Sequence, residues 1–158
     1  MPLTINLRHL EKKALHLEGD LSAEELDLAS FDELVQPAGA LRYALEAERL
    51  GKSILVQGSL QLDLTCTCAR CLKLYAHEIT LDEFALDLLL EGEDKVEVVN
   101  DCVDLTPFIR EDILLAFPQH PLCDTDCSGL PITTPEPGRE RKGVGDSSAW
   151  SALNKLKF

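Results

Sequence analysis

Hydrophobic residues alternate with polar ones along the middle of the chain. Residues 40–50, "ALRYALEAERL", and residues 53–66, "SILVQGSLQLDLTC", have an apolar side chain at almost every second position. A period of two over such lengths predicts half-buried antiparallel strands. Gly51 and Lys52 stand between the two runs and predict a tight hairpin turn. Gly58 falls on the apolar face of the second run, where a glycine indicates a bulge or a bend.

A third alternating run follows in residues 74–90, "LYAHEITLDEFALDLLL". Its apolar side chains occupy odd-numbered positions in the first half and even-numbered positions in the second half. One extra residue in a strand moves the side chains that follow to the opposite face. The change of parity therefore predicts a one-residue bulge near Asp82 and Glu83. A switch from strand to helix is the alternative.

Shorter elements surround these three runs. Residues 3–7, "LTINL", residues 13–19, "KALHLEG", and residues 96–100, "VEVVN", each predict a short strand. Ser22 and Glu25 have the spacing of a capping box, which predicts one or two helical turns.

The main helix is predicted within residues 104–118, "DLTPFIREDILLAFP". Its apolar side chains recur at intervals of three and four residues, as they do on one face of a helix. Asp104 or Thr106 can cap the start of this helix. Pro107 suits its first turn, and Pro118 ends it.

These patterns predict an α+β fold with an antiparallel sheet that is strongly twisted or barrel-like, one main helix and a short C-terminal helix. Residues 1–127 are predicted to form a single α+β domain. Residues 128–146 are rich in Pro and Gly and predict a flexible linker. Residues 147–158, "SSAWSALNKLKF", are predicted to form a short basic helix with Trp150 and Leu153 on one side.

The charge is distributed unevenly along the 158 residues. Residues 1–137 carry 10 Lys and Arg against 26 Asp and Glu, a net charge of −16. Residues 138–158, the basic tail, carry 5 Lys and Arg against 2 Asp and Glu, a net charge of +3. Phosphate binding needs clustered Lys and Arg, so the acidic body is not expected to bind free nucleic acid.

A cytoplasmic location is expected from the N-terminal sequence and the hydropathy. The first residues, "MPLTINLRHLEKK", lack the apolar core of a signal peptide. No apolar run approaches the roughly 20 residues that a membrane helix needs. In the reducing cytoplasm, the six cysteines are expected to be reduced, metal-bound or buried rather than linked by disulfides.

Four of the six cysteines have the spacing of metal ligands. Cys68 and Cys71 form a C-x₂-C pair at the end of a predicted strand, and Cys123 and Cys127 form a C-x₃-C pair far along the chain. A C-x₂-C turn aims two thiolates at one point, and a second pair completes the tetrahedron that zinc prefers. The spacing predicts a structural zinc site with these four ligands.

Other interpretations of the cysteines remain open. Cys66 shares the parity of its apolar neighbours and is expected to point into the core. Cys102 is expected to be a packing residue or a thiol without a functional role. Either thiol can still substitute as a fourth ligand. A redox pair at Cys68 and Cys71 is the enzymatic alternative, but it needs a helix N-terminus after a strand, and strands are predicted on both sides.

The sequence shows no active site. The four histidines form no motif, and there is no Gly-rich phosphate loop and no nucleophile elbow. Adjacent acidic residues are common at this composition and are expected to be solvated.

The order of the motifs resembles that of a known family. A strand runs into "CARCL", residues 68–72, and an acidic strand pair follows. Residues 103–130, "VDLTPFIREDILLAFPQHPLCDTDCSGL", then precede a linker and a short terminal helix. This order resembles the YceD-like family, bacterial and plastid proteins named for large ribosomal RNA subunit accumulation. The resemblance covers nearly the whole chain and is most specific in residues 54–72 and 103–130.

The resemblance carries over to individual cysteines. The family's second cysteine pair is followed in many members by further cysteines, whereas here Gly129, Leu130 and Pro131 follow. The Asp-Pro-Arg that begins the family's last helix is replaced by residues 146–148, "DSS". The positions that match the family's two pairs are Cys68, Cys71, Cys123 and Cys127, and they suffice for one zinc ion.

The family implies a non-enzymatic ribosome-biogenesis factor that supports accumulation of large-subunit ribosomal RNA. The acidic body is then expected to bind a basic partner, such as a ribosomal protein or another assembly factor. The basic tail is expected to contact ribosomal RNA weakly, or to act as a linker with a docking helix held by Trp150. The side chains proposed for the RNA contact are Arg139, Arg141, Lys142, Lys155 and Lys157.

Two classes of rival function remain. One is a metal- or thiol-dependent enzyme, either a thiol oxidoreductase or a nuclease acting on ribosomal RNA, although the sequence lacks a redox context and a paired carboxylate–histidine metal site. The other is an interaction domain unrelated to ribosomes.

Overall fold

The computed structural model describes residues 2–131. The predicted linker and terminal helix therefore lie outside the described residues, apart from residues 128–131. In chain order, the elements are β1 (Thr4–Asn6), α1 (Leu7–Leu10), β2 (Leu15–Leu21), β3 (Val35–Pro37), β4 (Leu41–Leu50), β5 (Ser53–Thr67), β6 (Leu74–Leu89), β7 (Cys102–Asp104) and α2 (Thr106–Ala116).

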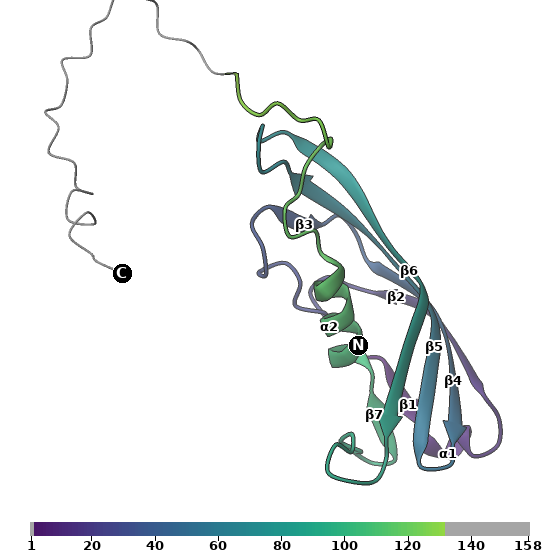
Figure 1. Ribbon diagram of the computed structural model, residues 1–158. Helices are drawn as coiled ribbons and strands as arrows, with labels where there is room; N and C mark the ends of the chain where they lie inside the picture. Colours follow the sequence, from purple (N-terminus) through teal and green to yellow (C-terminus); the bar gives the residue numbers. More distant parts are fainter. Residues whose placement is uncertain (1, 132–158) are drawn as a thin grey trace, which may run out of the picture.

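A five-stranded antiparallel sheet makes up most of the fold (Figure 1). The β4–β5 hairpin turns at Gly51 and Lys52, as predicted, and Gly51 has a φ of +61°. On one side, β6 pairs with β5 along nearly its whole length. On the other side, β4 pairs with the first part of β5 and β3 with its last part, while β2 lies beyond β4. The strands β1 and β7 form a separate two-stranded sheet.

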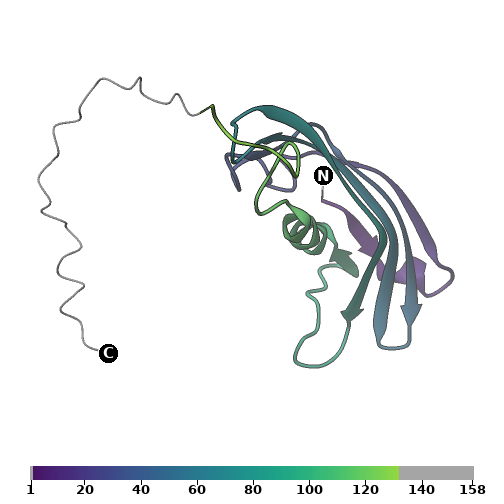
Figure 2. The ribbon, with the colours of Figure 1, turned by 45° about the horizontal axis from the view of Figure 1, so that its top comes forward.

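The structure confirms the predicted α+β class and the antiparallel sheet. In residues 2–131 the sheet does not close into a barrel. It is an open sheet whose strands twist along its length (Figure 1). It curves around α2, which lies on its concave side (Figure 2). The other helix, α1, has four residues, so α2 is the main helix.

The bulge predicted in the third alternating run is present in β6. The register of β6 against β5 shifts by one residue between Gly58 and Leu60. At that point Asp82 and Glu83 lie opposite a single residue of β5. The extra residue keeps the apolar side chains of both halves of β6 on the same face. The alternative, a switch to helix, is wrong.

The core lies between the concave face of the sheet and α2. Alternate residues of β5 point inward, including Cys66 as predicted, and α2 adds Ile109 and Ile113. Burial of each such aliphatic side chain stabilises the fold by about 1.5–3 kcal/mol. At the start of α2, the Asp104 carboxylate accepts a hydrogen bond of 2.9 Å from the backbone N–H of Thr106. The inward β5 side chains are Ile54, Val56, Leu60, Leu62, Leu64 and Cys66.

Two short elements differ from the prediction. Residues 96–100 form only a single bridge, from Val99 to Cys102, because the chain reverses at Asn100 and Asp101, which both have positive φ. The strand begins after this turn, at β7. The capping box also forms, with a 2.9 Å hydrogen bond from the Ser22 N–H to a Glu25 carboxylate oxygen. The segment remains a series of turns rather than a helix.

Neither helix of the described residues has the length and the apolar character needed to span a membrane.

Gly58 is the position where a side chain is least tolerable. It has a φ of +151°, and an added Cβ would lie 2.9 Å from the Cα of Leu45 and even closer to the carbonyl oxygen of Ala44. We expect Gly58→Ala to lower the free energy of unfolding by about 2 kcal/mol or more, because both the backbone conformation and the neighbouring strand resist the methyl group.

Urea denaturation of both proteins measures this change. Gly39→Ala is the matched control, since Gly39 has open space around its Cβ position. Equal midpoints for Gly58→Ala and Gly39→Ala would contradict the close approach of β4 to β5 at Gly58.

Candidate metal centre

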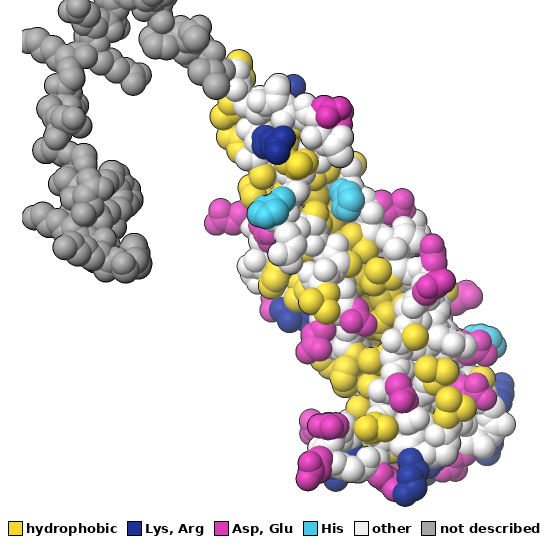
Figure 3. Space-filling model, in the orientation of Figure 1, with side chains coloured by type: hydrophobic (Ala, Val, Ile, Leu, Met, Phe, Trp, Pro, Cys, Tyr) yellow, Lys and Arg dark blue, Asp and Glu magenta, His cyan; other side chains and the backbone are white. Residues whose placement is uncertain are grey.

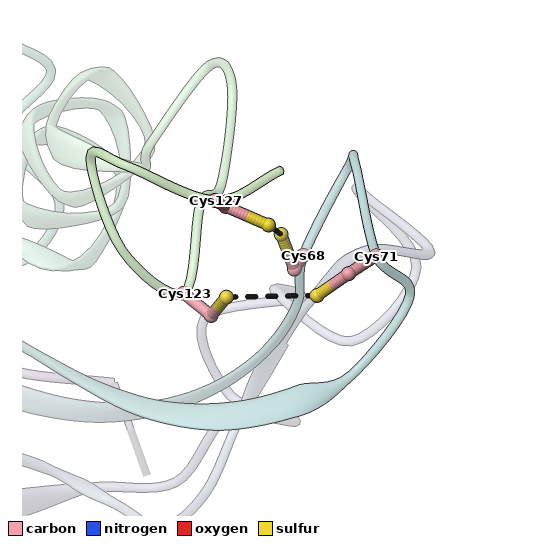
Figure 4. Close-up of side chains that lie close together, drawn as sticks. All are labelled: Cys68, Cys71, Cys123 and Cys127. Carbon is pink, nitrogen blue, oxygen red and sulfur yellow. Dashed lines mark hydrogen bonds between the residues drawn. The ribbon is translucent and has the colours of Figure 1, made fainter. Parts of the chain in front are cut away.

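The four predicted ligand cysteines come together at one end of the sheet. Cys68 and Cys71 lie in the turn between β5 and β6, and Cys123 and Cys127 lie in the loop that follows α2. All four sulfur atoms are within 4.8 Å of one another. Figure 4 shows the side chains of the two segments pointing toward each other. We call this group the cysteine cluster.

The sulfur–sulfur separations in the cysteine cluster fit a tetrahedral metal site. Cys68 Sγ is 3.7 Å from Cys127 Sγ, and Cys71 Sγ is 3.5 Å from Cys123 Sγ. Zinc bound to four thiolates at about 2.3 Å implies sulfur–sulfur edges of roughly 3.8 Å. A disulfide needs about 2.0 Å, and all six cysteines are free. The spacing of the sulfur atoms therefore fits a shared zinc ion.

Hydrogen bonds to backbone carbonyls hold the cysteine cluster in place. Ala69 N–H donates to the Pro121 carbonyl at 2.7 Å and so joins the turn that carries Cys68 and Cys71 to the loop that carries Cys123 and Cys127. The Arg70 guanidinium donates to the Cys127 carbonyl at 3.1 Å. Within the first turn, Leu72 N–H donates to the Cys68 carbonyl at 2.9 Å. The geometry of the cluster is therefore set by the backbone as well as by the thiols.

The electrostatics of the cluster favour a bound cation. Backbone N–H groups of Cys71 and Cys123 lower the pKa of the Cys68 thiol to about 6, so that it is a thiolate at neutral pH. Side-chain hydrogen bonding with the neighbouring Cys71 and Cys127 raises the pKa of the Cys123 thiol to about 12. Four adjacent sulfurs cannot all ionise without a positive charge among them, and a divalent metal would supply that charge.

The two remaining cysteines lie apart from the cluster. Cys66 is fully buried in the core, and burial raises the pKa of its thiol. It is therefore a packing residue, as predicted. Cys102 begins β7 and is partly exposed. Neither belongs to the group of cysteines whose sulfurs lie close together.

The redox alternative finds no support in the position of the first pair. Cys68 and Cys71 lie between two antiparallel strands and not at a helix N-terminus. The helix dipole that activates the thiols of a typical redox pair is absent from this turn.

The outer face of the sheet is strongly acidic, which the alternating pattern alone could have indicated. The strand positions that point away from the core, together with the two bulge residues, carry nine acidic side chains, whereas Arg42 is the one Lys or Arg among them in the described strands. Arg42 is paired with Asp63 at 3.1 Å. The acidic residues of this acidic outer face are Glu18, Asp20, Glu46, Glu48, Asp63, Glu78, Asp82, Glu83 and Asp87.

A hollow of about 550 Å³ lies at the centre of the acidic outer face. The β6 bulge forms one wall with Asp82 and Glu83, and Glu18 and Glu46 lie on the other side. His16 is 3.7 Å from the Glu46 carboxylate. The bulge thus keeps the apolar side chains of β6 on the core face, and it places Asp82 and Glu83 near Glu18 and Glu46 on the outer face.

The predicted RNA-contacting residues lie outside the described residues. These are Arg139, Arg141, Lys142, Lys155 and Lys157. Their role stays a prediction.

The curated proteins similar to this chain are described as uncharacterized. Uncharacterized proteins of Mycobacterium bovis and of two strains of Mycobacterium tuberculosis are 27% identical over 126 residues. The aligned part covers 71% of this chain and 59% of each relative, so the chain spans less than two thirds of their length. No solved structure matches the chain.

A family model gives the assignment. The model described as large ribosomal RNA subunit accumulation protein YceD matches residues 56–157, which include the cysteine cluster, α2 and most of the basic tail. Because this match extends over well more than half of the sequence, the chain belongs to the YceD family.

Proposed function

We propose that this chain is a non-enzymatic ribosome-biogenesis factor that supports accumulation of large-subunit ribosomal RNA in the cytoplasm. The observation that carries the proposal is the match of residues 56–157 to the YceD family. The described residues add a large charged surface and a cysteine cluster, and both suit an assembly factor that works by binding.

The acidic outer face supports a basic protein partner. Nine carboxylates with a single arginine among them create a negative potential over one side of the sheet. Such a surface attracts a ribosomal protein or another basic assembly factor and speeds its association, while it repels bare RNA phosphate. We therefore place the protein partner on the sheet and restrict direct RNA contact to the basic tail.

A structural zinc ion in the cysteine cluster is the second part of the proposal. Cys68, Cys71, Cys123 and Cys127 would hold the ion, and it would link the β5–β6 turn to the loop after α2. Four thiolates leave no open coordination position, which is typical of a structural site rather than a catalytic one. The tip of the sheet would then be fixed relative to α2.

Removal of one zinc ligand tests the structural site. We expect protein purified under reducing conditions to contain one zinc per chain by elemental analysis, and Cys71→Ser to lose it. A ligand present at 1,000 times its dissociation constant stabilises by about 4 kcal/mol. For a chain of this size, that loss lowers the melting temperature by roughly 10 °C.

Cys102→Ser is the matched control, because Cys102 lies outside the cluster. It should keep the zinc and its melting temperature within about 2 °C. A zinc-free wild-type protein with six titratable thiols would overturn the metal site, and the family role would then rest on the acidic outer face and the basic tail.

Deletion of the gene tests the ribosomal role. We expect sucrose-gradient profiles of the deletion strain to show a reduced large-subunit peak, restored by the wild-type protein. A normal large-subunit peak in the deletion strain would contradict the proposal and would favour an interaction domain unrelated to ribosomes.

Charge reversal on the sheet tests the partner surface in the same strain. The double variant Glu18→Lys with Glu83→Lys changes the hollow of the acidic outer face, and we expect it not to restore the peak. The control variant, Glu93→Lys with Glu97→Lys, makes the same change of net charge in the loop between β6 and β7 and should restore it. If both variants restored the large-subunit peak, the ribosomal role would stand, but the acidic outer face would not be the binding site of the protein partner.

A further inference from the structure

An apolar groove lies beside the C-terminal half of α2. Its volume is about 620 Å³, and it is formed by the end of α2 and by the loop between β2 and β3. Phe31 and Leu115 are 57% and 79% exposed, although both are large and apolar. Figure 3, in the orientation of Figure 1, shows hydrophobic side chains exposed along the molecule and bordered by Asp and Glu. We call this site the α2 groove.

Aromatic and aliphatic side chains shape the α2 groove. The rings of Phe31 and Phe117 meet edge to face, with centroids 6.1 Å apart. Leu115 projects on the side of α2 opposite Ile109 and Ile113, which face the core. A single exposed leucine needs no explanation, but an exposed leucine and phenylalanine that line one hollow indicate a binding surface.

The rim of the α2 groove is acidic. Asp32 and Glu111 line it. An occupant of the groove should therefore combine apolar side chains with Lys or Arg.

The chain itself carries a segment of this chemistry outside the described residues. Residues 147–158 contain Trp150 and Leu153 at helical spacing, with Lys155 and Lys157 beside them. The body up to residue 137 has a net charge of −16, and the basic tail has a net charge of +3. The apolar and charged features of the segment thus match those of the α2 groove.

The length of the connecting chain permits this contact. Eighteen residues separate Pro131, the last described residue, from Trp150. A flexible chain of that length spans roughly 23 Å on average and up to roughly 60 Å when extended. Gln119, which lines the groove, precedes Pro131 by twelve residues and is therefore within about 43 Å of it. The short connection gives the segment an effective concentration in the millimolar range, so even a weak contact is populated.

We propose that the α2 groove is the docking site of the chain's own C-terminal segment, residues 147–158, with Trp150 placed between Phe31 and Leu115 and the lysines at the acidic rim. The inference does not rest on the ribosomal role.

Trp150 is the one tryptophan of the chain and reports on the contact directly. In the full-length protein we expect blue-shifted Trp emission and weak quenching by acrylamide. Leu115→Asp should reduce the ratio of docked to undocked segment by roughly tenfold, because the carboxylate replaces the apolar contact. The emission should then shift to longer wavelength and quenching should increase. Since Leu115 is 79% exposed, the fold should survive, with an unchanged far-ultraviolet circular dichroism spectrum.

Leu74→Asp is the matched control, because Leu74 is 72% exposed and lies at the start of β6, outside the α2 groove. It should leave the emission of Trp150 unchanged. A second pair of variants tests the charges: Glu111→Lys on the rim should expose Trp150, whereas Glu78→Lys on the acidic outer face should not.

Three results would overturn the proposal. The first is solvent-like emission of Trp150 in the wild-type protein. The second is an equal shift for Leu115→Asp and Leu74→Asp. The third is a blue shift that disappears on dilution together with a change in mass by light scattering, since the occupant would then be the segment of a second copy.

Discussion

The fold depends on burying one face of β5 against α2. Six alternate side chains of this strand point inward, and β3, β4 and β6 all pair with it. Because side chains alternate along a strand, β6 can share this buried face along its whole length only with the extra residue at Asp82 and Glu83. Gly58, opposite the bulge, lets the backbone of β4 approach at that point. The core and the acidic hollow on the outer face thus have a common geometric origin.

The long sheet also explains why cysteines distant in sequence meet. The β5–β6 pair extends beyond the region covered by β4, and its turn meets the loop that leaves α2. There are few apolar side chains in this turn, and Leu72 and Leu74 are more than half exposed. Hydrogen bonds such as that from Ala69 to Pro121 join the two segments, and a metal ion shared by the four sulfurs would add a strong link where the hydrophobic core does not reach.

Much of this arrangement could be predicted from the sequence because it follows from periodicity. The alternation predicted β4, β5 and β6. The change of parity predicted the bulge, since in a continuous strand one extra residue returns the apolar side chains to the same face. The spacing of the cysteines predicted which four thiols would meet. The pairing of β1 with β7 and of β3 with β5 could not be predicted, because three-residue strands carry no periodic signal. The α2 groove could not be predicted either, since Phe31 and Leu115 line it from a loop and a helix that are distant in sequence.

The two proposals for the basic tail compete for the same lysines. Lys155 and Lys157 would bind either the carboxylates of the α2 groove or the phosphates of RNA, but not both at once. The intramolecular contact has the advantage of high effective concentration, and the net charge of −16 on the body repels free RNA. A basic protein bound to the acidic outer face would neutralise part of that charge and weaken the repulsion. If the proposed function holds, RNA contact through the tail would be favoured only when the protein partner is already in place, and protein binding and RNA binding would be coupled.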